Sequence, residues 1–275
     1  MGSSSAQSRR EILQLLDEAG HRPNKHFGQN FLVDPNVVDR IVAVAELERS
    51  SQVVEVGAGT GTLTRALAEV AGTVVAYEID GSLAEVLNET TDGFGNVDVR
   101  ISDAAKLDLD VSLGDGSWSM VANLPYNVGT GIVLDAVRCA PRIGRFVVMV
   151  QKEVADRLVA GPGSKTYGIP SVIAGLHVRS RIVFTVPPEV FEPRPTIESA
   201  VVVMDRINSP ALAGRAIELA SAAFGQRRKM IRGSLKSVLG DPLPIIEAAS
   251  LEPTARAETL SPLDFVALAE AEAGR

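Results

Sequence analysis

The chain has 275 residues, of which 45% are hydrophobic, and its formal net charge at pH 7 is −7 with a sequence pI of about 5.1. This size and composition allow an α/β core with a smaller second domain, and the single cysteine, Cys139, excludes a disulfide within the chain. No apolar run approaches the ~20 residues of a transmembrane helix, so we expect a cytoplasmic protein without membrane contact.

Helices and strands are predicted to alternate along most of the chain. Residues 1–5 lack the apolar core of a signal peptide and should form a disordered tail, and a helix is expected near residues 8–19. A second helix should open at Asp34, with Pro35 in its first turn. Strands are expected at residues 53–56, 73–77, 97–101 and 120–122, around Phe146, and at residues 178–186 and 199–206. From about residue 211 the β-branched runs stop, and four or five short helices should follow.

Such alternation predicts a parallel sheet with helices on both faces. The three histidines have no cysteine or acid at metal-ligand spacing, so we expect no metal site. Cys139 lies in a helical stretch and is expected to be a buried structural thiol.

Four of these strands end in residues that can contact a ligand. The first runs into a turn with glycines at 57, 59 and 61, and the next three end at Glu78, Asp103 and Asn123. Because the carboxyl ends of parallel strands meet at one edge of a sheet, we expect these residues to share a site, with Glu78 able to bond ribose hydroxyls. The glycine spacing differs from the dinucleotide pattern, and no lysine follows Gly61 as in a phosphate loop. The turn therefore suits close approach by a ligand without a pyrophosphate, although such glycines also occur for packing alone.

The segment Asn123-Leu124-Pro125-Tyr126 offers an amide, two carbonyls and an aromatic ring at a strand end. Alone, it is more often an ordinary strand exit in which proline fixes φ. Following the glycine turn and the two acids in order, it predicts a pocket for the exocyclic amine of an adenine.

Together these motifs resemble those of S-adenosylmethionine-dependent rRNA adenine N6-dimethyltransferases. The resemblance is closest to the small-subunit (16S) rRNA branch, rather than to the antibiotic-resistance branch that modifies large-subunit RNA. It extends over residues 9–270 and also rests on residues 25–32, 149–155, 191–199 and 224–229. The chain departs from the family pattern at Thr196, where a cation is usual, and at Ser102, where glycine is common.

This resemblance implies a Rossmann-like α/β methyltransferase sheet of seven strands with the last antiparallel, followed by a small C-terminal all-α domain. It divides the chain into an N-terminal arm and helix at residues 1–20 and a catalytic, S-adenosylmethionine-binding domain at residues 21–207. A helical RNA- or ribosome-binding domain would occupy residues 208–275. The strands at 178–186 and 199–206 would be the pair that closes the sheet.

The resemblance also implies roles for individual residues. Asp103 and the Ala104 amide would bind the adenine of the cofactor. The Asn123 side chain and a main-chain carbonyl of Leu124 or Pro125 would accept the N6 hydrogens of the target adenine. Tyr126 would stack on that base, and Phe191 is the candidate for its opposite face. The cofactor site would comprise Gln29, Asn30, Leu32, Gly57, Gly59, Gly61, Glu78, Ile79, Asp103, Ala104 and Asn123.

The net charge is unusual for RNA binding, because phosphate neutralisation dominates affinity for nucleic acids. The charges are unevenly distributed, however: residues 46–115 hold 14 acids and 4 bases, and residues 138–194 hold 9 bases and 4 acids. Each basic residue alone is better explained as solvated surface, but together they predict an RNA footprint. The candidate RNA contacts are Arg138, Arg142, Lys152, Arg157, Lys165, Arg179, Arg194, Arg227, Arg228, Lys229 and Arg232.

Three functions stay open at this point. The first is dimethylation of two adjacent adenosines near the 3′ end of 16S rRNA within an assembling small ribosomal subunit, by a monomer that takes part in subunit biogenesis. The second is a resistance-type or DNA adenine methyltransferase, against which residues 224–229 and the helical tail argue. The third is a non-catalytic RNA-binding assembly factor, against which the intact glycine turn and residues 123–126 argue.

Overall fold

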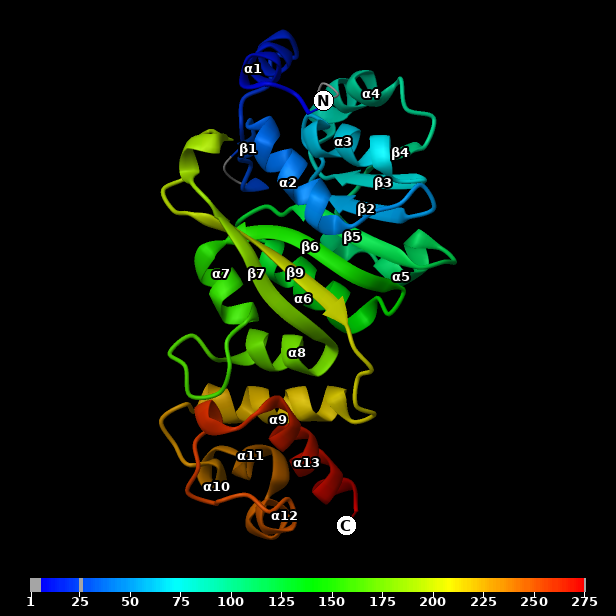
Figure 1. Ribbon diagram of the computed structural model, residues 1–275. Coiled ribbons are helices and arrows are strands. Elements are labelled where there is room, and N and C mark those ends of the chain that lie inside the picture. Colours follow the sequence, from blue (N-terminus) through cyan, green and yellow to red (C-terminus); the bar gives the residue numbers. More distant parts are fainter. Residues whose placement is uncertain (1–5, 25–26, 275) are drawn as a thin grey trace. The chain divides into compact units, whose positions relative to one another are not determined.

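The structure is a computed structural model that describes residues 6–24 and 27–274 (Figure 1). The predicted tail at residues 1–5 and the first part of the segment 25–32 lie outside the described residues. The chain forms two compact units. One, here called the sheet unit, comprises Met1–Ala155 and Arg181–Asp205, and the other, the helical unit, comprises Asp156–Ser180 and Arg206–Arg275.

A seven-stranded sheet has the strand order β4-β3-β2-β5-β6-β9-β7. Its strands are β2 (Gln52–Val56), β3 (Thr73–Glu78), β4 (Val97–Ile101), β5 (Trp118–Asn123), β6 (Ile143–Gln151), β7 (Val178–Val186) and β9 (Ser199–Arg206). The central strands pair in parallel, whereas β9 pairs with β6 antiparallel. This confirms the predicted seven-stranded sheet with an antiparallel last strand.

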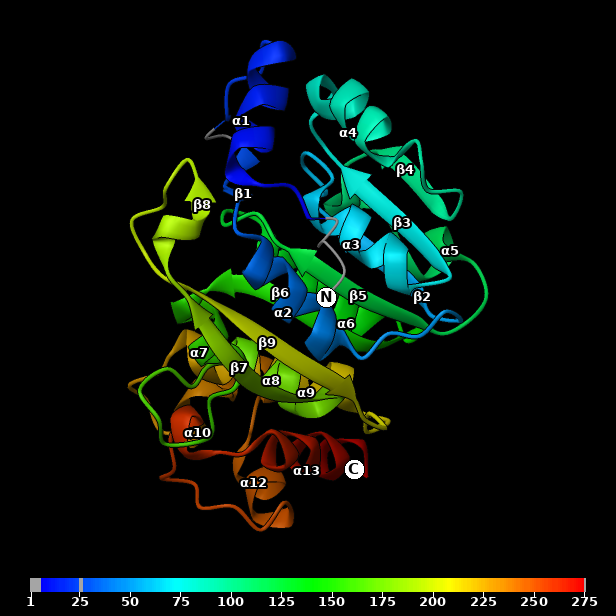
Figure 2. The ribbon, with the colours of Figure 1, turned by 45° about the horizontal axis from the view of Figure 1, so that its top comes forward.

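Helices pack on the sheet through apolar residues at alternate strand positions. Those of the sheet unit are α1 (Arg9–Glu18), α2 (Pro35–Ala45), α3 (Thr62–Val70), α4 (Ala84–Thr91), α5 (Leu109–Leu113), α6 (Gly129–Cys139) and α7 (Lys152–Leu158), which extends past the unit's boundary. On one face Val53, Val121 and Val147 are buried beneath α2 and α3, which lie side by side in Figure 2. Two predicted helix starts are confirmed: Ser8 and Glu11 form a capping box before α1, and Asp34 caps α2.

The helical unit contains α8 (Ile169–His177), α9 (Ala213–Gly225), α10 (Ile231–Ser234), α11 (Lys236–Leu239), α12 (Leu243–Ala248) and α13 (Pro262–Ala273). The rings of Tyr167 and Phe265 pack against that of Phe224, with centroids 5.8 and 6.3 Å away. The Tyr167 hydroxyl also donates to the Leu260 carbonyl (2.7 Å). These contacts tie the loop before α8 to the C-terminal helices. The unit is therefore larger than the domain predicted at residues 208–275, because it includes Asp156–Ser180.

Cys139 differs from the prediction. It is the last residue of α6 but lies on the exposed side of that helix, whereas Ala136 and Val137 face the core. The predicted helix was correct, and the predicted burial of the thiol was wrong because the last turn of α6 points this position away from the sheet.

Candidate functional site

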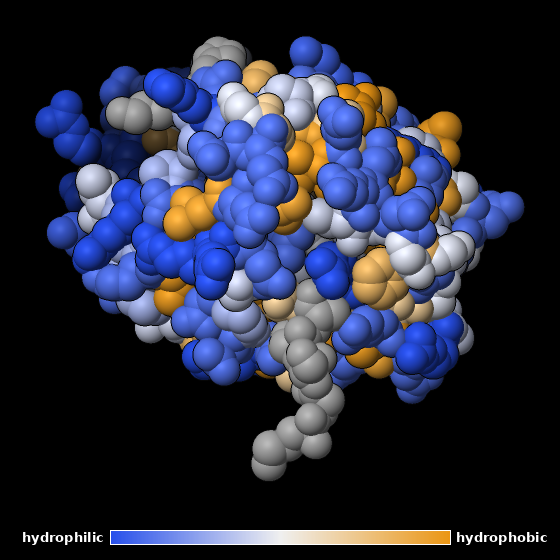
Figure 3. All heavy atoms as spheres, turned by 90° about the horizontal axis from the view of Figure 1, so that it is seen from above, coloured by the Kyte–Doolittle hydropathy of each residue, from blue (hydrophilic) through white to orange (hydrophobic). Residues whose placement is uncertain are grey.

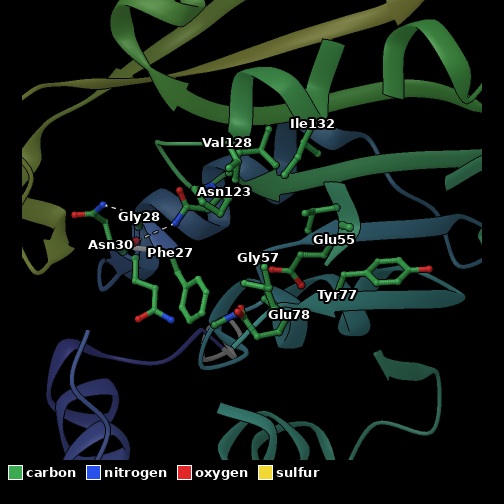
Figure 4. A pocket seen from close by; sticks show the side chains of 18 of the residues that line it. Phe27, Gly28, Asn30, Glu55, Gly57, Tyr77, Glu78, Asn123, Val128 and Ile132 are labelled. Carbon is green, nitrogen blue, oxygen red and sulfur yellow. Dashed lines mark hydrogen bonds between the residues drawn. The ribbon is translucent and has the colours of Figure 1, made fainter. Parts of the chain in front are cut away.

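A cavity of about 460 Å³ opens where β2, β3 and β5 end (Figure 4). Most of the residues predicted for the cofactor and the target base line it. These are Gln29, Asn30, Leu32, Gly57, Gly59, Glu78, Ile79, Asp103, Ala104, Asn123, Leu124, Pro125 and Tyr126. Gly61 and Phe191 were predicted for the same site but do not line the cavity. The volume is in the range of small-molecule sites.

The glycine turn brings the two halves of the cavity together. Gly57 has φ +83°, and a Cβ there would lie 3.3 Å from the Pro125 ring and 3.4 Å from the Asn123 carbonyl oxygen. A side chain would therefore separate the turn from the Asn123 segment. A Cβ on Gly61 would instead lie 2.7 Å from the Thr90 hydroxyl, on the side of α4. In this geometry Gly61 serves packing rather than ligand contact.

Two buried carboxyl groups lie at the floor of the cavity. Glu78 accepts hydrogen bonds from the Gly59 and Asp80 amides (2.8 and 2.9 Å), yet burial raises its pKa above the ordinary value. Glu55 is 1% exposed and accepts a hydrogen bond from the Thr64 hydroxyl (2.6 Å). Burial, together with the charge of Glu78, raises the pKa of Glu55 to about 8. Two acids held in this way favour a ligand that brings positive charge.

Sequence reasoning placed Glu55 in a buried strand but gave it no role. Figure 4 shows its side chain beside Gly57 and Glu78. The available signal was an acid inside an apolar strand directly before a glycine turn, since a buried acid without a partner is costly.

Asp103 and Ala104 form one wall of the cavity. Asp103 caps the short 3₁₀ turn Ala104–Lys106 by accepting from the Ala105 amide (3.1 Å), and it pairs with the Lys106 ammonium (2.9 Å). The hydrogen bond from Lys106 lowers the pKa of Asp103, so this carboxylate is charged at neutral pH. Ala104 is buried.

The Asn123 side chain is oriented by a hydrogen bond from its amide nitrogen to the backbone of Asn30. Its Nδ2 donates to the Asn30 carbonyl oxygen (3.2 Å), which leaves Oδ1 as an acceptor for a ligand (Figure 4). The carbonyl oxygen of Pro125 already accepts from the Gly129 amide (2.7 Å) at the start of α6. Of the two carbonyls predicted as the second acceptor, that of Leu124 is therefore favoured.

Tyr126 is held from two sides. Its hydroxyl hydrogen-bonds the hydroxyl of buried Ser199 (2.5 Å), and its ring meets that of Phe191 edge-on, with centroids 6.4 Å apart and an interplanar angle of 69°. Phe191 is fully buried. This geometry does not support the predicted stacking of Phe191 on the opposite face of a base, because its ring lies behind Tyr126 and supports it.

The segment predicted to cap the site closes over the ends of β2 and β3. Gln29 donates to the Asp80 carboxylate (2.8 Å), which also accepts from the Ser82 hydroxyl (2.6 Å). Beyond it, β1 (Phe31–Leu32) pairs antiparallel with β8 (Phe191–Glu192). The capping segment and the segment 191–199 are thus joined, although 160 residues separate Phe31 and Phe191 in the sequence.

The surface of the protein combines hydrophilic and apolar areas. The face in Figure 3 is mostly hydrophilic, and hydrophobic side chains appear on it in several separate groups. At the cavity itself, Ile79 and Val128 are 41% and 43% exposed. Exposed apolar side chains beside a concave site suit the flat face of a base.

The candidate RNA-binding residues differ in how firmly they are held. Arg142 donates to the Asp110 and Gly114 carbonyls (3.0 and 2.9 Å) and pairs with Asp115, so it joins the turn before β6 to α5 and the loop that follows α5. Arg138, Arg194 and Arg227 pair with Asp135, Glu189 and Glu258. Arg228, Lys229 and Arg232 are exposed in the helical unit.

Comparison with known proteins decides the family. The sequence profile described as Ribosomal RNA adenine dimethylase matches residues 20–271. The chain belongs to this family. The predicted family resemblance is therefore confirmed over nearly the whole chain.

Relatives of this rRNA adenine dimethylase family cover most of the chain. The chain is 43% identical to the Ribosomal RNA small subunit methyltransferase A of Kineococcus radiotolerans, over 97% of this chain and 91% of the relative. The chain is 41% identical to the protein of the same name from Cutibacterium acnes, over 94% of this chain and 92% of that relative. The structure is similar to a dimethyladenosine transferase from Plasmodium falciparum, with TM-score 0.76 and 23% identity over 86% of this chain and 95% of that one. The structure is also similar to the 23S rRNA methyltransferase ErmE, with TM-score 0.68 and 27% identity over 88% of this chain and 99% of that one.

The rRNA adenine dimethylase family uses S-adenosylmethionine, and the residues of the cavity fit this cofactor. The positive φ at Gly57 exposes the backbone to a close ligand, and two buried acids at the cavity floor suit its positive charge. Within the described residues, no group of three or more His, Cys, Asp or Glu side chains could hold a metal ion. In the same part of the chain, none of the helices has the length and apolar character needed to span a bilayer.

Proposed function

We propose that this protein transfers methyl groups from S-adenosylmethionine to N6 of two adjacent adenosines near the 3′ end of 16S rRNA, within the small ribosomal subunit. The observation that supports the proposal is the close approach of the glycine turn to the Asn123–Tyr126 segment within one cavity, where a Cβ on Gly57 would lie only 3.3 Å from the Pro125 ring. We further propose that it acts in the cytoplasm as a monomer and contributes to subunit biogenesis.

Each group of the acceptor site has a task in methyl transfer. S-adenosylmethionine supplies a methyl group already activated on a sulfonium, so the protein mainly has to position the acceptor. Asn123 Oδ1 and the Leu124 carbonyl would accept the two N6 hydrogens in the first transfer, and one of them would accept the remaining hydrogen in the second. As N6 attacks the methyl carbon, the bond from that carbon to sulfur would break and leave a neutral thioether. Positive charge would develop on N6 and strengthen these hydrogen bonds, and N6 would then lose a proton to solvent.

Tyr126 would stack on the target base, an interaction worth about 1–3 kcal/mol. Its hydrogen bond to Ser199 and its contact with Phe191 keep the ring in place before the base arrives. Because N6 cannot be reached inside a paired stack, the adenosine must be splayed out of the RNA.

The roles of the remaining predicted residues follow from their positions. Glu78 would bind the ribose hydroxyls of the cofactor, and Asp103 with Ala104 would bind its adenine, with Gln29, Asn30 and Leu32 closing the site. We propose that residues 208–275, which lie within the helical unit, contact the ribosome. Relatives named for the small subunit are 40–43% identical, whereas ErmE is 27% identical, and this favours 16S rRNA over 23S rRNA as the substrate.

The substrate is tested by offering labelled S-adenosylmethionine with four acceptors in parallel: unmodified small subunits, large subunits, naked rRNA and DNA. We expect label only in small subunits, recovered as N6,N6-dimethyladenosine on nucleoside analysis. Label in large subunits would support the resistance-type function instead. If no acceptor is labelled although the subunits bind the protein, the non-catalytic assembly factor would replace the proposal.

The RNA footprint is tested by reversing the exposed charges of Arg228 and Lys229 to glutamate. We expect binding to unmodified small subunits to weaken by at least about tenfold and its salt dependence to become shallower, since fewer phosphates are neutralised. Arg227 is left unchanged, because it holds Glu258 and the Lys165 carbonyl within the helical unit. The matched control reverses exposed Arg10 and Arg49, which changes the net charge equally. Equal affinities for both double variants at several salt concentrations would place the footprint elsewhere.

A further inference from the structure

Gln7 connects the N-terminal arm to the glycine turn. It is 2% exposed and lies two residues before α1. Its Nε2 donates to the Thr60 carbonyl (3.1 Å), and its Oε1 accepts from the hydroxyls of Thr60 (2.9 Å) and Thr62 (2.7 Å). One side chain thus makes three buried hydrogen bonds to residues 53 and 55 positions away.

Both threonines line the cavity, whereas Gln7 does not. Thr60 lies between two glycines with positive φ, Gly59 and Gly61, so this part of the turn has many accessible backbone conformations when unconstrained. Glu78 holds the turn at the Gly59 amide, and Gln7 holds the next residue through both its carbonyl and its hydroxyl. The turn is therefore fixed from two directions.

The arm that carries Gln7 is itself anchored. Ala6 belongs to the hydrophobic cluster beneath α2 and α3, and Ile12 and Leu16 of α1 pack with Phe31, Val33 and Leu83. Arg9 forms an ion pair with Glu192 at 2.5 Å. Gln7 is held on both sides along the chain, so its amide is a fixed support for the turn.

We propose that Gln7 is a positioning residue for cofactor binding, which holds Thr60 and Thr62 in the conformation that S-adenosylmethionine requires. The proposal rests on the cofactor site of the proposed function. It gives the N-terminal arm a part in cofactor affinity, although no atom of Gln7 lines the cavity.

The test replaces Gln7 with methionine, which keeps the length of the side chain and removes all three hydrogen bonds. The dissociation constant for S-adenosylmethionine is measured by calorimetry at a temperature where all variants are fully folded. We expect the dissociation constant to rise about tenfold, because without these hydrogen bonds only about one tenth of the molecules would hold the turn in the conformation that binds the cofactor. In steady state, KM for the cofactor should rise while kcat at saturating cofactor is retained. The control is Gln14→Met on the exposed side of α1, for which we expect no change.

Gln7→Glu serves as the second variant, because its carboxylate can still accept from both threonines but cannot donate to the Thr60 carbonyl. We expect an affinity between those of wild type and Gln7→Met, and this variant carries the test if Gln7→Met does not fold. Lower stability of both variants with an unchanged dissociation constant would overturn the proposal, since a purely structural residue gives that pattern. If the wild type itself binds no S-adenosylmethionine, the cofactor assignment fails, and the role of Gln7 fails with it.

Discussion

Replacing Asn123 with alanine is expected to lower methyl transfer to unmodified small subunits by at least about 10²–10³-fold, the effect of removing one preorganised transition-state hydrogen bond. The side chain would lose the only acceptor that it offers to N6, while the glycine turn, Glu78 and Asp103 stay intact. Affinity for S-adenosylmethionine should therefore stay within a few fold of wild type. Both quantities are measured on the same preparation, by single-turnover transfer of labelled methyl groups and by calorimetry.

Two further variants sharpen this test. Asn123→Asp keeps an acceptor oxygen but replaces the donor to the Asn30 carbonyl with a second acceptor, so we expect its activity to be as low as that of the alanine variant. Asn88→Ala, on the exposed side of α4, is the matched control and should have wild-type activity. Unchanged turnover in Asn123→Ala would remove the acceptor site from the Asn123–Tyr126 segment.

The features predictable from sequence are those encoded locally. The bounds of β7 and β9 agree with the predicted ranges, because runs of β-branched residues end at turn-forming residues there. The glycine turn, Glu78, Asp103 and Asn123 follow successive strands, so knowing that the sheet is parallel was enough to place them at one edge.

The features that were missed depend on contacts between distant segments. Nothing near Gln7 indicates that its amide will reach a turn more than 50 residues away. Phe191 was assigned to a base because it is aromatic and lies near prolines, but the pairing of β1 with β8 holds it in the core. Likewise, the sequence shows that Arg142 is basic, but not that two carbonyls already engage it.

Glu55→Gln should make the protein without its cofactor more stable at alkaline pH. The pKa of Glu55 is about 8 in the folded protein and ordinarily 4.5, so between these values the folded state binds more protons than the unfolded state. The contribution of Glu55 to the free energy of unfolding therefore falls as pH rises through this window. Glutamine cannot ionise and can still accept from Thr64. At pH 8 we expect the variant to be more stable by about 2–4 kcal/mol, and near pH 4.5 the two proteins should be alike.

The same substitution should weaken binding of S-adenosylmethionine. The positive charge of the cofactor favours the ionised form of Glu55, so wild-type affinity should rise with pH up to about 8, with release of a proton on binding. The variant should lose this dependence and discriminate less against the uncharged thioether product. Denaturant unfolding and calorimetry from pH 4.5 to 9 measure both effects, and the difference between the two proteins isolates Glu55 from Glu78 and Asp80. If the free energy of unfolding and the cofactor affinity change with pH in the same way for both proteins, Glu55 does not titrate in this range. Its carboxyl would then be a structural partner of Thr64 alone.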